Sequence, residues 1–164
     1  EIGPPCGEFT LDPATANGHP MVFLAGGIGV TPLLSMAKSL QHARATTPVR
    51  FVQAARNSRV HALANEVRGL ETDGADVRTR VIYDDPLADD LSVGRCDAVG
   101  VMNTALLREW TPFENADYYL CGPAPFMASV LTSLKKLGVP EERIRHEFFG
   151  PKQSLEVAPA AAMA

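Results

Sequence analysis

The chain has 164 residues, of which 46% are hydrophobic, and a formal net charge of −4. This length and composition are sufficient to bury one substantial core, so a single domain is expected. The 15 Lys and Arg residues are scattered along an acidic chain, which argues against a nucleic-acid-binding surface. No apolar run approaches the roughly 20 residues that span a bilayer, and no signal-peptide pattern is visible.

The cysteine content indicates a reducing compartment. Cys6, Cys96 and Cys121 are odd in number, widely spaced and without a C-x-x-C pair. This pattern favours free thiols in the cytoplasm over a disulfide framework or a zinc site. The histidines lack metal-ligand spacing and the serines lack a strand–turn–helix elbow, so neither a metal site nor hydrolase chemistry is expected. The chain begins at Glu1 without a methionine, which favours a fragment of a longer protein.

The first elements alternate between strand and helix. An extended segment rich in Pro and Gly covers residues 1–12, and a turn at Asn17-Gly18 precedes a strand over 21–25. Leucine and alanine at helical spacing predict a helix from about 32 to 43. A second strand is then predicted over 49–55.

The middle of the chain continues this alternation. Asn57 or Ser58 is predicted to cap a second helix. The apolar face of that helix is predicted to consist of Val60, Leu63, Ala64, Val67 and Leu70. A third strand over 77–83 places Arg78 and Arg80 on one face, which indicates an edge position.

The last third begins with an irregular polar loop over 84–100 and a short helix over 104–109. A strand over 117–121 follows, then an apolar-faced helix that ends at Gly138, and a last strand over 144–149. The repeated alternation predicts an α/β fold, an open doubly wound parallel sheet of about five strands in the order 3-2-1-4-5 with helices on both faces.

The most informative segment covers residues 21–32, where an apolar run ends in three glycines, Gly26, Gly27 and Gly29. Thr31 is predicted as the N-cap of the following helix and Pro32 as its first residue. Unpaired N–H groups and the positive end of the helix dipole attract an anion there, and glycine lets that anion approach the backbone. The segment therefore predicts a site for a dinucleotide pyrophosphate. A purely structural turn is the alternative, because Pro32 stands where the last glycine of G-x-G-x-x-G would fall.

Three further motifs accompany this segment: Pro5-Cys6-Gly7-Glu8-Phe9, Cys121-Gly122-Pro123 and Glu147-Phe148-Phe149-Gly150-Pro151. Together the four motifs resemble the pyridine-nucleotide half of the ferredoxin–NADP reductase superfamily. Within it, Ala54-Ala55-Arg56-Asn57, Val60-His61-Ala62 and the segment from Tyr119 to Met127 are most similar to flavohaemoglobins.

Flavohaemoglobins are cytosolic nitric oxide dioxygenases in which a globin, an FAD barrel and an NAD domain follow one another. The resemblance implies a flavin oxidoreductase that passes hydride from NADH or NADPH to FAD, and electrons onward to haem. The flavin-binding barrel and the globin are implied as partners in the same parent chain. Two alternatives remain open: a reductase that feeds a different acceptor, and a non-catalytic nucleotide-binding α/β module.

The resemblance also divides the chain. Residues 1–16 correspond to the end of the flavin-binding barrel and a linker, and residues 17–151 to the NAD(P)H-binding domain. Residues 152–164 form a small-residue tail that is expected to be disordered.

Individual residues take roles from the same resemblance. Cys121 is expected beside the nicotinamide, without acting as a nucleophile, and Phe149 over the flavin ring; these two are the catalytic candidates. A side chain at Gly29 is expected to fall on the pyrophosphate without disturbing the sheet. The cofactor-binding candidates are Gly26, Gly27, Ile28, Gly29, Val30, Thr31, Pro32, Ala55, Arg56, Asn57, Cys121, Gly122, Pro123, Phe126, Met127, Phe148, Phe149, Gly150 and Pro151.

The coenzyme preference is left open by the residues after the second strand. Arg56 and Arg59 are either solvated loop charges or partners for a 2′-phosphate, and no acidic residue lies between Phe51 and Asn65 to bind a ribose 2′-hydroxyl. The resemblance favours NADH with tolerance for NADPH. His61 and His146 are expected to pack or to form hydrogen bonds, not to catalyse.

Overall fold

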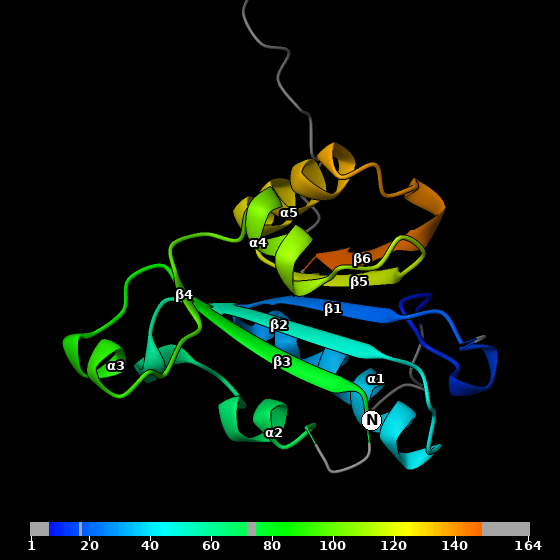
Figure 1. Ribbon diagram of the computed structural model, residues 1–164, viewed down its shortest axis with the longest axis horizontal. Helices are drawn as coiled ribbons and strands as arrows, with labels where there is room; N and C mark the ends of the chain where they lie inside the picture. Colours follow the sequence, from blue (N-terminus) through cyan, green and yellow to red (C-terminus); the bar gives the residue numbers. More distant parts are fainter. Residues whose placement is uncertain (1–6, 17, 72–74, 149–164) are drawn as a thin grey trace, which may run out of the picture.

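The computed structural model describes residues 7–16, 18–71 and 75–148. Its centre is a six-stranded sheet in the order β4-β3-β2-β1-β5-β6 (Figure 1), and every pair of neighbouring strands is parallel. The strands are β1 (Met21–Gly26), β2 (Val49–Ala55), β3 (Val77–Tyr83), β4 (Ala98–Val99), β5 (Asp117–Gly122) and β6 (Ile144–Phe148). The chain winds outward from β1 in one direction and then in the other, which confirms the expected doubly wound α/β fold.

Helices cover both faces of the sheet (Figure 1). The α-helices are α1 (Val30–His42), α2 (Ala64–Arg68), α3 (Ala88–Ser92), α4 (Thr104–Trp110) and α5 (Ala124–Lys136). Short 3-10 turns are η1 (Pro13–Thr15), η2 (Gly27–Gly29), η3 (Ser58–Val60) and η4 (Glu141–Arg143).

Alternate residues of the central strands supply two cores. Phe23 and Ala25 of β1 pack with α1 and α2 in what we call the α1-side core, which includes Val30 and Leu33. Val22 and Leu24 point the other way into the α5-side core, which includes Leu107, Met127, Val130 and Leu134. Since β1 is buried on both faces, its sequence is a continuous apolar run with no polar alternation.

The structure corrects several expected boundaries. The helix α1 begins at Val30 with Gly29 as its N-cap, so Thr31 lies inside the helix and does not cap it. The second helix is reduced to η3 and the five residues of α2. Leu63 takes a left-handed conformation with φ of 55° between them, so no continuous helix carries the expected apolar face.

The segment 84–100, expected to be an irregular loop, contains α3 and β4. The strand β4 pairs only with Ile82 and Tyr83 of β3. It therefore replaces β3 as the outer strand at one end, while Arg78 and Arg80 still lie on a stretch of β3 that β4 does not cover.

Candidate functional site

The glycine loop follows β1 at the carboxyl edge of the sheet, and its glycines serve different purposes. Gly27 has φ of +54°, and a Cβ built on it would meet nothing within 4 Å. A Cβ on Gly29 would collide with the carbonyl of Cys121 and lie 2.7 Å from the amide nitrogen of Gly122. Gly29 is therefore required for close contact with the end of β5, and the expectation that its side chain would fall on a ligand without disturbing the sheet is wrong. Gly27 is the position that opens outward.

Gly26 and Gly122 make room for an aromatic ring. A Cβ on Gly26 would lie 2.7 Å from Cγ and Cδ1 of Phe126, and one on Gly122 would lie 2.6 Å from Cδ1 of the same ring. The ends of β1 and β5 thus form a glycine surface on which Phe126 of α5 rests. Glycine at both positions lets the ring approach the two strand ends this closely.

The first turn of α1 lacks a side-chain cap. Its N-cap is Gly29, and the hydroxyl of Thr31 donates to the carbonyl oxygen of Ile28 at 3.1 Å instead of accepting from a backbone N–H. The amide of Val30 donates to the carbonyl oxygens of Gly27 and Ile28, so η2 runs directly into α1. The turn η2 has no side-chain cap, and the positive end of the helix dipole therefore lies at residues 27–29. This geometry suits an anion such as a pyrophosphate.

A cavity of about 380 Å³ opens at the same edge, beside the ends of β1, β2 and β3 and the start of α5. Six predicted site residues line it: Gly26, Gly27, Ala55, Arg56, Pro123 and Phe126. Seven others line it that the sequence analysis did not select: Ala54, Asp84, Gly100, Val101, Met102, Pro125 and Ser129. Four of these seven residues follow β3 or β4 in the chain: Asp84, Gly100, Val101 and Met102. Since β4 has only two residues, its sequence shows no strand pattern that could have predicted this wall.

The remaining candidates do not line this cavity. Val30 and Met127 are fully buried in the two cores. Ile28 is 47% exposed next to the loop, and Thr31 and Pro32 lie on the first turn of α1. Phe148 packs against the α5-side core. Phe149, Gly150 and Pro151 lie outside the described residues.

Cys121 ends β5 with its side chain in the α1-side core, where only 1% of the residue is exposed. Burial, and then the charge of Glu147, raises the pKa of the Cys121 thiol to about 11. The thiol is protonated at neutral pH, and a thiol is a weak nucleophile in that form. Its position agrees with a packing role next to the glycine loop.

The loops after β2 and β3 are joined to each other. Arg56 Nε donates to Asp85 Oδ2 at 3.0 Å, and the amide nitrogen of Asp85 donates to the carbonyl oxygen of Arg56 at 3.0 Å. The side-chain amide of Asn57 donates to the carbonyl oxygen of Asp85 at 3.2 Å. Asn57 also accepts from the amide of Arg59 at 3.2 Å, so it caps the short turn η3 and not the continuous second helix that was expected. Arg56 is thus an ion-paired charge at the cavity wall.

The buried carboxylate of Asp90 links the segment after β2 to the segment after β3. Its Oδ2 accepts from the amides of Ser58 at 3.2 Å and Leu87 at 3.0 Å, while Arg95 Nε lies 3.5 Å from Oδ1. Burial opposes ionisation, but the hydrogen bonds and Arg95 outweigh it and hold the pKa of Asp90 below its ordinary value. The carboxylate therefore connects η3 to α3 beneath the loop that carries Arg56.

His61 is a structural residue. Its Nδ1 lies 2.7 Å from the hydroxyl of Tyr83, and the two rings meet edge to face with centroids 5.4 Å apart. Burial and the charge of Arg68 lower the pKa of His61, so the ring is neutral at pH 7. The expectation of a hydrogen-bonding histidine is confirmed.

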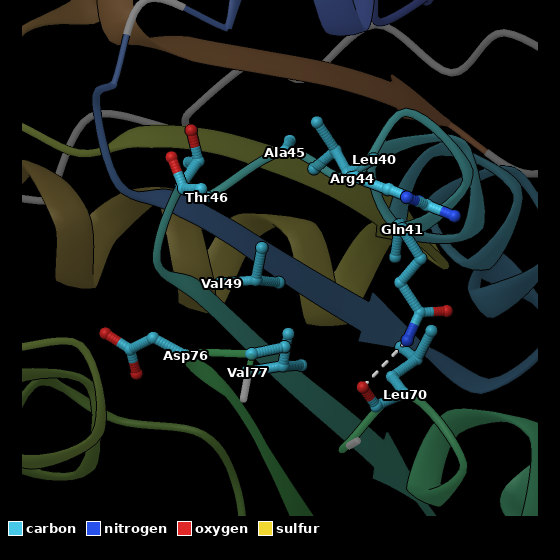
Figure 2. A pocket seen from close by; sticks show the side chains of 12 residues that line it. Leu40, Gln41, Arg44, Ala45, Thr46, Val49, Leu70, Asp76 and Val77 are labelled. Carbon is cyan, nitrogen blue, oxygen red and sulfur yellow. Dashed lines mark hydrogen bonds between the residues drawn. The ribbon is translucent and has the colours of Figure 1, made fainter. Parts of the chain in front are cut away.

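A second cavity, of about 400 Å³, lies at the opposite edge of the sheet (Figure 2). Leu40 and Gln41 of α1, and Arg44 just after its end, face Val49 and Val77 at the starts of β2 and β3 there. Gln41 Nε2 donates to the carbonyl oxygen of Leu70 at 2.9 Å. It contains none of the predicted site residues. It also lies at the negative end of the α1 dipole, which disfavours a phosphate.

Within the part of the chain that the structure describes, there is no group of three or more His, Cys, Asp or Glu residues that could hold a metal ion. Every helix found in those residues is too short or too polar to cross a lipid bilayer.

A doubly wound parallel sheet, with a glycine loop and a cavity at its carboxyl edge, defines a nucleotide-binding α/β domain. The family model described as "Oxidoreductase NAD-binding domain" matches residues 23–132, more than half of the chain. The chain belongs to that family.

Its relatives include flavohemoproteins. The protein of Rhodopirellula baltica is 57% identical over 155 residues, which cover 94% of this chain and 38% of that protein. The flavohemoprotein of Pseudomonas putida is 40% identical over 157 residues, which cover 95% of this chain and 38% of that protein. The chain thus spans well under half the length of these relatives.

Solved structures agree with this assignment. The flavohem-like FAD/NAD-binding domain of nitric oxide dioxygenase from Vibrio cholerae is 32% identical with a TM-score of 0.73, over 89% of this chain and 56% of that one. The flavohemoglobin of Malassezia yamatoensis with bound FAD and heme is 24% identical with a TM-score of 0.70, over 87% of this chain and 33% of that one, and it supports the fold alone.

Proposed function

We propose that this chain is the NAD(P)H-binding part of a flavohaemoglobin-type nitric oxide dioxygenase. In that enzyme it would deliver hydride from NADH or NADPH to FAD, from which electrons pass to haem. The identity to flavohemoproteins over more than nine-tenths of the chain supports this proposal.

The described residues fit a pyridine dinucleotide. The observation that carries the proposal is Gly27, an outward-opening glycine with positive φ that lines the cavity and begins η2, the turn without a side-chain cap that leads into α1. A pyrophosphate would be held there by backbone N–H groups. The adenosine half would extend along the ends of β2 and β3 toward Arg56, in the direction that the cavity takes.

The protein's contribution to the chemistry is position and electrostatics. When bound, the reduced nicotinamide supplies the hydride. Gly29 and Gly122 keep the ends of β1 and β5 close together. Cys121 keeps its thiol protonated and buried, so it adds no competing nucleophile at that point. Phe149 is proposed, from the resemblance of its motif, to lie against the flavin.

The wider arrangement is also part of the proposal. Residues 1–16 would end a flavin-binding barrel and lead into the domain over 17–151, with a tail over 152–164. The barrel would hold most of the FAD, and a globin would hold the haem. Cys96 and Cys121 are free thiols, which favours a reducing cytoplasm.

The glycine loop provides the test of nucleotide binding. Gly27→Asp places a carboxylate beside the expected pyrophosphate, whereas Gly27→Asn is a neutral control of the same size. Asn and Asp are the residues that best tolerate positive φ, so the two variants share the backbone strain. Calorimetric titration with NADH and with ADP-ribose should show binding at least about tenfold weaker for the Asp variant than for the Asn variant, about 1.4 kcal/mol. Equal affinities would contradict the assignment of the loop.

Absorbance of the intact enzyme separates the proposed function from its rivals. A Soret band together with flavin absorption supports the flavohaemoglobin type. Flavin alone supports a reductase that feeds another acceptor, and neither chromophore supports a binding module without catalysis.

A further inference from the structure

The cavity wall on the side of β2 and β3 carries an unusual balance of charge. Arg56 is the one cationic side chain among its described lining residues, and Asp84 is the one anionic side chain. Asp85, next in the chain, forms an ion pair with Arg56 at 3.0 Å. Asp85 therefore adjoins the one guanidinium that lines the cavity, and Asp84 lies on the same wall. Arg59, the other arginine expected near a 2′-phosphate, is exposed on η3 and does not line the cavity.

The backbone keeps this pair in place. The amide of Asp84 donates to the carbonyl oxygen of Ala55 at 3.2 Å, and that of Asp85 donates to the carbonyl oxygen of Arg56 at 3.0 Å. Asn57 adds a third bond across the same gap, to the carbonyl oxygen of Asp85 at 3.2 Å. Asp85 is thus held opposite Arg56 by the continuation of the β2–β3 pairing, independently of the ion pair.

We propose that Asp85 determines coenzyme selectivity by holding Arg56 in an ion pair and so keeping its guanidinium from a ribose 2′-phosphate. This inference rests on the proposed function, because it assigns the cavity wall to the adenosine half of the dinucleotide. A 2′-phosphate would have to displace Asp85 from Arg56 and remain close to two carboxylates. A 2′-hydroxyl carries no charge and meets neither obstacle.

The exposure of the pair sets the size of the effect. The side chains of Arg56 and Asp85 are 70% and 63% exposed. An ion pair so open to water is weak and easily rearranged. Asp85 therefore weakens binding of the phosphorylated coenzyme only moderately. Removing its charge should free the guanidinium of Arg56 to bind the 2′-phosphate.

The test uses ligands that lack nicotinamide, so the result does not depend on a flavin. ADP-ribose and 2′-phospho-ADP-ribose differ only in the 2′-phosphate, and each is titrated by calorimetry into the full 164-residue chain. Asp85→Asn should tighten 2′-phospho-ADP-ribose about fourfold, about 0.8 kcal/mol, and change ADP-ribose less than about 1.5-fold. Adding Arg56→Ala to Asp85→Asn should abolish the gain.

Asp76→Asn is the matched control. Asp76 forms an ion pair with Arg50 at 2.9 Å near the starts of β2 and β3, at the opposite edge of the sheet. Its loss changes the net charge by the same amount, and it should leave both affinities unchanged.

The outcomes separate the two ideas. Absence of ADP-ribose binding to the wild-type chain would overturn the proposed function and the inference with it. Normal ADP-ribose binding with an unaltered ratio in Asp85→Asn would overturn the selectivity inference alone. The same gain in the Arg56→Ala background would also overturn it, because the effect would then be general repulsion and not the release of Arg56.

Discussion

Cys121 lies at the end of β5, next to the glycine loop of the candidate site, and its thiol is unreactive there. Its thiol lies in the α1-side core, and burial raises its pKa to about 11. The carbonyl of the same residue makes the close contact that requires glycine at position 29. The backbone of Cys121 therefore shapes the loop, while its side chain stabilises the core.

This residue leads to a prediction about stability at alkaline pH. The folded state keeps the thiol protonated up to about pH 11, whereas the unfolded chain releases the proton from about pH 9. Stability is therefore lost as pH rises through that interval. Between pH 8.5 and 10.5 the wild type should lose on the order of 2 kcal/mol more unfolding free energy than Cys121→Ala. Urea unfolding at both pH values measures this difference, and both proteins keep Cys96 and the tyrosines. Parallel pH dependence in the two proteins would contradict the prediction.

The sequence predicted the roles of single residues correctly where neighbours in the chain determine them. It failed where contacts with residues distant in the chain determine them. The glycines after the first strand predicted the loop and its strand-to-helix context correctly. The roles of Gly26 and Gly29 depend on Phe126 and on the end of β5, about a hundred residues away in the chain. No local pattern contains those contacts, so the sequence could not indicate which glycine faces a ligand.

At the scale of elements, long apolar patterns were reliable and short ones were not. Both thirteen-residue helices, α1 and α5, were predicted with their buried faces. The periodicity after β2 predicted a helix through Val60 and Leu63, yet these residues are 58% and 37% exposed. Gln53, buried in β2, donates to the carbonyl oxygen of Ala62 at 2.8 Å, a contact that pins the chain where the helix was expected to continue. Tertiary hydrogen bonding thus overrides helical spacing there.

The connection between η3 and α3 gives a prediction at this scale. Asp90→Asn removes the charge that Arg95 and two backbone amides share, and it places an NH₂ group in a site that holds donors. The melting temperature should fall, and binding of ADP-ribose should weaken severalfold because the loop after β2 loses its support. Asp89→Asn, on the exposed side of α3, is the control and should leave both measurements unchanged. Thermal melts and calorimetry on the two variants distinguish a support role from a general effect of charge.

At the scale of the whole molecule, two cavities of similar volume lie at opposite edges of one sheet, at the two ends of α1. The fold class, the doubly wound order and the carboxyl-edge location of the site all followed from the alternation of elements. That alternation did not predict the structure of the segment from Asp84 to Ser92. It also did not predict that Gly100, Val101 and Met102 would form a wall of the cavity. Their positions come from backbone pairing with β3 and from the hydrogen bond of Ser129 to the carbonyl oxygen of Met102 at 3.2 Å.

The electrostatic asymmetry of α1 predicts which cavity binds the nucleotide. The start of α1, preceded by η2 without a side-chain cap, gives a positive potential at Gly27, whereas the last turn, next to the cavity of Figure 2, offers carbonyl groups and a negative potential. Hydrogen exchange measured by mass spectrometry with saturating ADP-ribose should therefore slow in residues 26–31, 54–58 and 84–86. Exchange in residues 40–47 should not change. A Gly27→Asp chain under the same conditions should lose the protection, because the carboxylate occupies the place of the anion. Protection confined to residues 40–47 would place the ligand at the amino edge, and the charge of Arg44 would then have outweighed the dipole of the helix.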